Sequence, residues 1–139
     1  MRTTVTTLVI VAAGALGSVA FARQNAGRAP ETVKEVMTSM TIPASDAIFD
    51  AASEPPTSPE GWAAARKAAA TLAESGRLLM TDALARDKAA WMDMAAALVK
   101  EAEATVKAVD GKDRDALEVV GDRIYATCAT CHGRYMAAN

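Results

Sequence analysis

The chain has 139 residues, with 15 Lys or Arg against 17 Asp or Glu and a net charge of −2 at pH 7. A mildly acidic chain without a basic stripe argues against binding to nucleic acid. The length suits one domain that is large enough to bury a hydrophobic core.

Residues 1–22 have the pattern of an export signal. Arg2 gives a short positive start, residues 8–19 are apolar or small, and residues 20–22 (Ala-Phe-Ala) match the small-x-small cleavage pattern. An uncleaved anchor is the alternative, although the apolar run is short for a membrane span. Cleavage would leave residues 23–139 as one domain with 14 basic and 17 acidic residues, a net charge of −3. We therefore expect a periplasmic protein that has no stable association with the membrane after cleavage.

A first helix is predicted from about Glu31 to Ala52. Pro43 cannot donate a hydrogen bond to the carbonyl of Ser39, so we expect a kink or a restart at the proline. The proline-rich stretch 53–58 then predicts a loop. The apolar stripe at the start of this helix consists of Val33, Val36, Met37 and Met40.

Two further helices follow the loop. Ser58 as N-cap and Pro59 at the first helical position predict a helix that runs to about Met80. After a connection at 81–86, the next helix is expected from about Lys88 to Val109. The predicted inner faces of these two helices consist of Trp62, Ala65, Ala69, Leu72, Gly76 and Leu79 in the first, and of Trp91, Met94, Leu98, Ala102, Thr105 and Val109 in the second.

A last helix is predicted to have Asp113 as its N-cap and to extend past the run Cys128-Ala-Thr-Cys131-His132. This C-x-x-C-H run is the attachment pattern of c-type haem. Two thiols one helical turn apart can each add to a vinyl group on the same porphyrin edge, and the adjacent imidazole then falls under the iron. We predict thioether attachment through Cys128 and Cys131, with His132 as the proximal iron ligand.

Two other chemistries use similar motifs. A structural zinc site needs four ligands, usually Cys and His, whereas the chain has two Cys and one His. A redox C-x-x-C pair follows a strand in a βαβ unit, and no strand is predicted. Both alternatives are therefore weaker than haem attachment.

Amphipathic helices joined by short loops predict an all-α fold, in the form of an antiparallel up-down-up-down four-helix bundle enclosing one covalently attached haem. No residue is marked by its spacing as a distal acid–base group, and the chain has no second His. We therefore do not expect an enzyme.

This layout, with its motif in the final helix, resembles the class II c-type cytochromes, that is, the cytochrome c′ family and its low-spin, Met-ligated relatives. The resemblance covers the layout of residues 23–139, and its one specific motif is residues 128–132. It implies one haem c and a residue of the first helix over the open face of the iron, usually Leu in gas-binding members and Met in electron-transfer members. The family also places an Arg of the first helix near the haem propionates, and this sequence has none there. Arg77, Arg123 and Arg134 are left as candidates for that role.

Met37 and Met40 are the two candidates for the distal ligand. Met37 is favoured because it lies in the uninterrupted part of the predicted helix, where a rigid backbone can aim the thioether. Met40 is closer to Pro43 and suits the filling of an irregular space. A core role for both is the remaining alternative.

Two functions follow from the resemblance. With Met37 on the iron, the protein would be a one-electron carrier that docks transiently on redox proteins. With no Met on the iron, a five-coordinate haem would bind nitric oxide or carbon monoxide. Met at both candidate positions favours the carrier. The alanine-rich flank of the second helix leaves a homodimer open.

Overall fold

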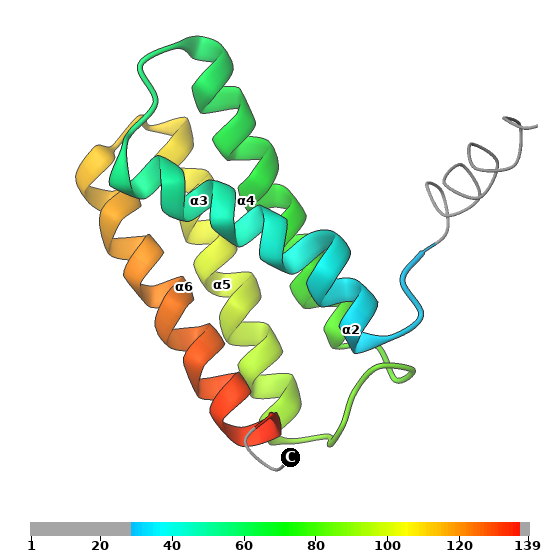
Figure 1. The fold of residues 1–139 in the computed structure, drawn as a ribbon. Coiled ribbons are helices and arrows are strands. Elements are labelled where there is room, and N and C mark those ends of the chain that lie inside the picture. The colour runs from blue at the N-terminus through cyan, green and yellow to red at the C-terminus, as the bar shows by residue number, and fades with distance from the viewer. Residues whose placement is uncertain (1–28, 137–139) are drawn as a thin grey trace, which may run out of the picture.

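The structure, a computed structural model, describes residues 29–136, and the predicted export signal at 1–22 lies outside the described residues. All regular structure in this range is helical, and no strand occurs within it. The all-α class predicted from the sequence is therefore confirmed. The elements are α2 (Val33–Val36), η1 (Met37–Thr41), α3 (Ile42–Ser53), α4 (Pro59–Leu79), α5 (Ala90–Asp110) and α6 (Arg114–Tyr135), shown in Figure 1.

Side-chain caps fix where the first helix begins. The amide of Glu35 donates to the Thr32 hydroxyl at 3.1 Å, and the amide of Thr32 donates to the Glu35 carboxylate at 3.1 Å. This reciprocal capping box satisfies two amides that the first turn leaves without partners. The helix therefore begins at Val33, two residues later than the sequence predicted.

The predicted caps of two later helices are confirmed. Ser58 accepts a hydrogen bond from the amide of Gly61 at 3.1 Å, at the start of α4. Asp113 accepts one from the amide of Ala116 at 3.0 Å, at the start of α6. Between α4 and α5 the chain follows an irregular connection at 80–89, longer than the predicted 81–86.

Regular α-helical structure ends at Val36 and restarts at Ile42, next to Pro43, which agrees with the predicted restart at the proline. Residues 37–41 form a π-helical turn, in which the amide of Ile42 donates to the carbonyl of Met37, five residues earlier. Pro43 then occupies the first turn of α3, where the missing amide is tolerated. The prediction that Met37 lies in the uninterrupted part of the helix is wrong, because Met37 is the first residue of the π-turn.

Helices α4, α5 and α6 lie side by side, and the segment formed by α2, η1 and α3 runs obliquely across them (Figure 1). The most extensive contact joins α4 to α5, followed by that between α5 and α6, while α3 packs on both α4 and α6. Gly76 permits the close approach of α4 to α5, because a Cβ there would lie 2.7 Å from a methyl group of Val99.

The core consists of two clusters. Ile48, Leu72 and Ile124 are fully buried in the larger one, which occupies the end of the molecule near the C-x-x-C-H run. Trp62 and Leu117 belong to the smaller one, at the other end. All six inner-face positions predicted for α4 are buried. None of the helices in residues 29–136 is long and apolar enough to cross a membrane.

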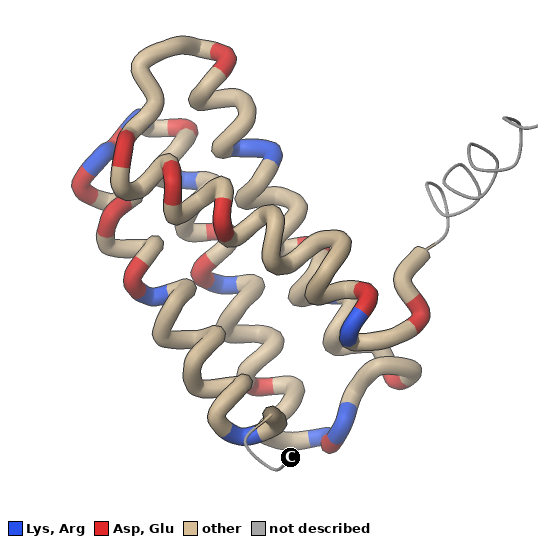
Figure 2. Tube along the Cα trace, in the orientation of Figure 1, with Lys and Arg blue, Asp and Glu red and all other residues tan. Residues whose placement is uncertain are grey.

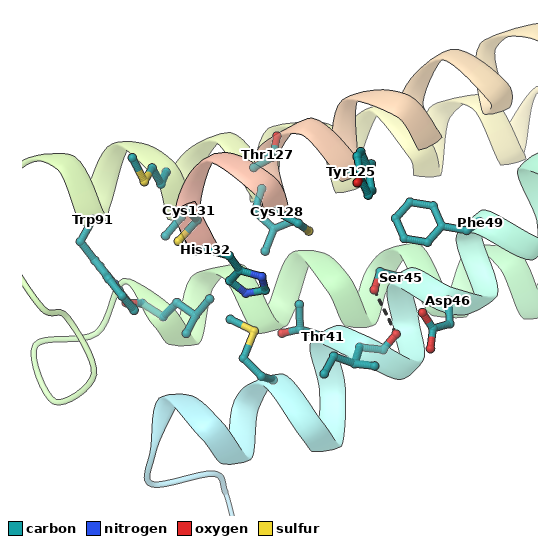
Figure 3. A pocket seen from close by; sticks show the side chains of 16 residues that line it. Thr41, Ser45, Asp46, Phe49, Trp91, Tyr125, Thr127, Cys128, Cys131 and His132 are labelled. Carbon is teal, nitrogen blue, oxygen red and sulfur yellow. Dashed lines mark hydrogen bonds between the residues drawn. The ribbon is translucent and has the colours of Figure 1, made fainter. Parts of the chain in front are cut away.

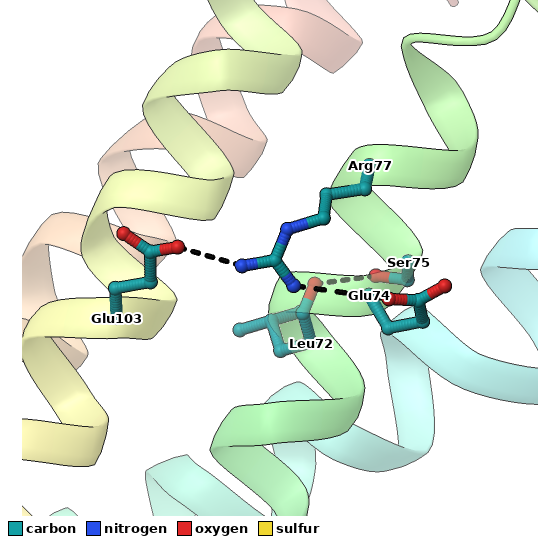
Figure 4. A network of polar contacts seen from close by, with 5 residues as sticks. All are labelled: Leu72, Glu74, Ser75, Arg77 and Glu103. Carbon is teal, nitrogen blue, oxygen red and sulfur yellow. Dashed lines mark hydrogen bonds and ion pairs between the residues drawn. The ribbon is translucent and has the colours of Figure 1, made fainter.

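Charged positions are spread over the surface, with acidic ones frequent along α3 and the first half of α6 (Figure 2). Arg77 is paired with Glu103 at 2.6 Å and with Glu74 at 3.7 Å (Figure 4). Exposed ion pairs of this kind contribute little to stability. They do engage the Arg77 guanidinium, which weakens it as a candidate for contact with a haem propionate.

Candidate functional site

One cavity of about 170 Å³ lies between the segment 37–49 on one side and α5 and α6 on the other. Its lining combines residues of η1, α3, the end of α4, α5 and the second half of α6, as Figure 3 shows. Most of the lining is apolar. Ile42, Asp46 and Tyr125 are exposed and also line the cavity, so it reaches the surface between α3 and α6.

The C-x-x-C-H run supplies the wall contributed by α6. Cys128, Cys131 and His132 all line the cavity, and Figure 3 shows the imidazole directed away from α6 toward the segment that carries Thr41. Their shared orientation follows from the helix, since residues three and four apart lie on one face. The three side chains that the sequence predicted as one site therefore face the same space.

The facing wall contains Met37 but not Met40. Met37 lines the cavity from the first residue of the π-turn. Met40 is partly buried and does not contribute to the lining. Of the two methionines considered from the sequence, the structure brings Met37 together with the C-x-x-C-H residues.

A third methionine was missed as a candidate. Met94 lines the cavity from α5, one turn after Trp91, which also lines it. The heptad pattern placed Met94 on the inner face of its helix, but nothing in the sequence indicated that this face meets the C-x-x-C-H residues. Met94 is therefore a second soft side chain within the cavity.

Polar side chains on the facing wall were also missed. Thr41, Ser45 and Asp46 line the cavity (Figure 3). The Ser45 hydroxyl donates to the carbonyl of Ile42 at 3.0 Å, and the buried Thr41 hydroxyl donates to the carbonyl of Val36 at 3.4 Å. The signal for these residues was present in the sequence, because Thr41 and Ser45 follow Met37 at intervals of four.

Both cysteines are free thiols in a partly buried setting. Burial raises the pKa of the Cys128 thiol above its ordinary value, and the neighbouring Cys131 adds to the rise. Burial also raises the pKa of Cys131. Both groups are therefore protonated at neutral pH. This contrasts with the lowered thiol pKa values of redox-active C-x-x-C pairs.

Metal coordination by side chains alone has little support at this site. Within residues 29–136, no group of three or more His, Cys, Asp or Glu side chains is arranged to hold a metal ion. A tetrahedral zinc site would need a further donor beside Cys128, Cys131 and His132. The one carboxylate among the residues that line the cavity, Asp46, comes from α3.

No protein-family model, curated protein or solved structure matches this chain. The functional interpretation therefore rests on the C-x-x-C-H run and on the side chains that the fold brings to the same cavity.

Proposed function

We propose that this protein is a periplasmic mono-haem c-type cytochrome that carries one electron, and not an enzyme. Cys128 and Cys131 would hold the haem through thioethers, His132 would be the proximal ligand and Met37 the distal one. The observation that carries the proposal is that these four side chains line a single cavity. The class II arrangement, a four-helix bundle around one haem c, belongs to the same proposal.

The donor set suits this group. The two thiols are one helical turn apart and the imidazole follows directly, all on the wall contributed by α6. Met37 contributes a soft thioether from the opposite wall, and the surrounding lining is mostly apolar. When bound, haem c with His and Met ligands cycles between ferrous and ferric iron, and the thioether raises its reduction potential.

The position of Met37 also favours electron transfer over gas binding. A thioether at the distal position fills the coordination site that nitric oxide or carbon monoxide would need. The opening between α3 and α6, flanked by the exposed Ile42 and Tyr125, gives a redox partner access to the cavity. A mixed rim of apolar and acidic side chains such as Asp46 suits brief docking with a partner of positive charge.

The test is the visible spectrum of purified protein that carries haem, oxidised and reduced, with and without carbon monoxide. Wild type is expected to be low-spin, to show a Met-to-iron charge-transfer band and to resist carbon monoxide. Met37→Leu should lose the band, bind carbon monoxide at once and show a fall in reduction potential on the order of 100 mV.

Met40→Leu and Met94→Leu are matched controls that remove one thioether each. Both variants should keep the band. Loss of the band in Met94→Leu, with retention in Met37→Leu, would assign the distal ligand to α5. A high-spin wild type that binds carbon monoxide immediately would replace electron transfer with gas binding, and the absence of covalent haem would refute the proposal.

A further inference from the structure

The last turn of α6, which carries His132, makes few packing contacts of its own. Ala129, Thr130, His132 and Arg134 are exposed. A Cβ built on Gly133 would meet no atom within 4 Å, so the turn is open there too. Glycine also weakens a helix interior. A contact with another part of the chain is therefore needed to hold this turn in place.

Tyr135 supplies that hold from the end of the helix. Its hydroxyl donates a hydrogen bond to the carboxylate of Asp87, 48 residues earlier in the chain. Its ring meets Trp91 edge to face, with 4.9 Å between the ring centroids and 69° between the planes. The guanidinium of Arg134 lies 5.6 Å from the centre of the same ring.

Asp87 is itself fixed by the start of α5. Its second carboxylate oxygen accepts hydrogen bonds from the amides of Ala89 at 3.2 Å and Trp91 at 3.1 Å. Trp91 in turn donates from its indole nitrogen to the carbonyl of Leu79 at 2.6 Å. The contact of Tyr135 with Asp87 and Trp91, called the Tyr135 clamp below, therefore ties α6 to the end of α4 and the start of α5.

We propose that Tyr135 and Asp87 are positioning residues for His132, an inference that rests on the proposed haem function. Tyr135 follows His132 by three residues, and the amide of Met136 donates to the carbonyl of His132 at 2.9 Å. A fixed Tyr135 therefore fixes the backbone of the turn that aims the imidazole into the cavity. Trp91 belongs both to the clamp and to the cavity lining, which links the two directly.

The first test is Tyr135→Phe, which removes the hydroxyl and keeps the ring against Trp91. Amide hydrogen exchange at residues 132–136 should become about tenfold faster, because this turn then opens without breaking the bond to Asp87. The haem-methyl NMR shifts of the ferric protein, which depend on the direction of the imidazole plane, should change or broaden. A residue that contributes to stability alone would leave those shifts unchanged.

Asp87→Asn separates two roles of Asp87, which are to accept hydrogen bonds from the backbone at the start of α5 and to accept one from Tyr135. The amide oxygen of Asn can still accept from the backbone at the start of α5, whereas the charge that strengthens the bond from Tyr135 is lost. We expect a smaller effect than that of Tyr135→Phe, and the double variant should match Tyr135→Phe, since both changes act on one bond. Thr81→Val is the control. It removes a hydroxyl from the same connection, but that hydroxyl donates to the carbonyl of Leu78 and takes no part in the clamp.

The outcomes separate the clamp from the haem proposal. If wild type carries haem and Tyr135→Phe leaves both the exchange rates and the haem-methyl shifts unchanged, the positioning role is wrong and the proposed function stands. Faster amide exchange with unchanged haem-methyl shifts would show that the clamp only stabilises the turn, and this result would also overturn the positioning role. A wild type without covalent haem would refute the proposed function, and with it this role, even if exchange in the haem-free chain responds to the variant.

Discussion

The carboxylate of Asp87 accepts hydrogen bonds from three donors, and these affect its titration. The Tyr135 hydroxyl and the Trp91 amide stabilise the charged form and hold the pKa of Asp87 below its usual value. Burial raises the pKa of Tyr135 above its ordinary value, and the bond to Asp87 raises it further. Charged Asp87 and neutral Tyr135 are therefore the paired states that the fold favours.

These directions set the pH window in which the clamp stabilises the fold. The lowered pKa of Asp87 gives a contribution that is present above the unfolded pKa, near pH 4, and is lost as pH falls through the lower folded value. The raised pKa of Tyr135 gives a second contribution to the stability of the fold. It is present below the unfolded pKa of Tyr135, near pH 10, and is lost as pH rises through the pKa of Tyr135 in the folded state. The clamp is thus intact throughout the neutral range.

Asp87→Asn should therefore melt at a lower temperature than wild type at pH 6, by a margin that shrinks as the pH is lowered to 3. The reason is that Asp87 of the unfolded wild type takes up a proton below about pH 4, which reduces the stability gained from the charged carboxylate in the fold, whereas Asn binds no proton. Thermal melting followed by circular dichroism at several pH values measures the difference. A margin that stays constant between pH 6 and pH 3 would contradict the assignment of the lowered pKa to Asp87.

At the scale of an element, the π-turn keeps two halves of one helix in phase. Val36 and Ala44 are both buried, although they are eight residues apart. In a regular α-helix that separation would leave them about 80° out of phase, because each residue turns the chain by about 100°. A wider turn at 37–41 absorbs the equivalent of one residue and returns both to the core.

A deletion should therefore be tolerated inside the π-turn and nowhere else in this helix. Removal of Ser39 together with Pro43→Ala should restore a regular α-helix, leave Val36 and Ala44 in phase, and retain a cooperative melt close to that of wild type. Ser39 is exposed, so its loss removes no core contact. The melting curve and the spectrum of the haem-loaded protein both measure the result.

Deletion of the exposed Ala47 is the matched control. It removes one residue from the regular helix α3 and rotates the preceding half by about 100°. Val36 would then leave the core, with an expected cost of about 2–5 kcal/mol, typical of a lost large core contact. Equal effects of the two deletions would show that the π-turn has no role in setting the register.

At the scale of the whole molecule, the cavity depends on elements that are far apart in sequence. Met37 and His132 reach it from opposite ends of the described chain, and Trp91 and Met94 from the middle. The fully buried Ile48, Leu72 and Ile124 hold the helices around it. The cavity is therefore a property of the complete helical assembly and not of any one motif.

Covalent attachment can be separated from folding at this scale. Replacement of Cys128 and Cys131 by Ala should abolish haem that resists acid-acetone extraction, while the helical signal in circular dichroism persists. The reason is that both thiols are partly buried at the cavity and neither belongs to the fully buried core. Haem retained by the double variant after extraction would contradict the attachment role of the motif.

The sequence by itself determined the helices, the caps at Ser58 and Asp113, and the candidate residues Cys128, Cys131 and His132. These features depend on local spacing and on hydrogen bonds between near neighbours, which a linear pattern contains. The same patterns predicted a restart of the helix at Pro43 but not the π-turn before it, because that turn depends on the phase between Val36 and the core residues of α3.

The tertiary structure decided which methionines face the C-x-x-C-H residues, and it brought Met37 and Met94 to the cavity while Met40 stayed out of it. It also paired Tyr135 with Asp87. Such contacts depend on how helices cross and on which turn of each meets its neighbour, and helical periodicity leaves those choices open. A helix pattern gives the face that is buried, and packing gives the partner that the face meets.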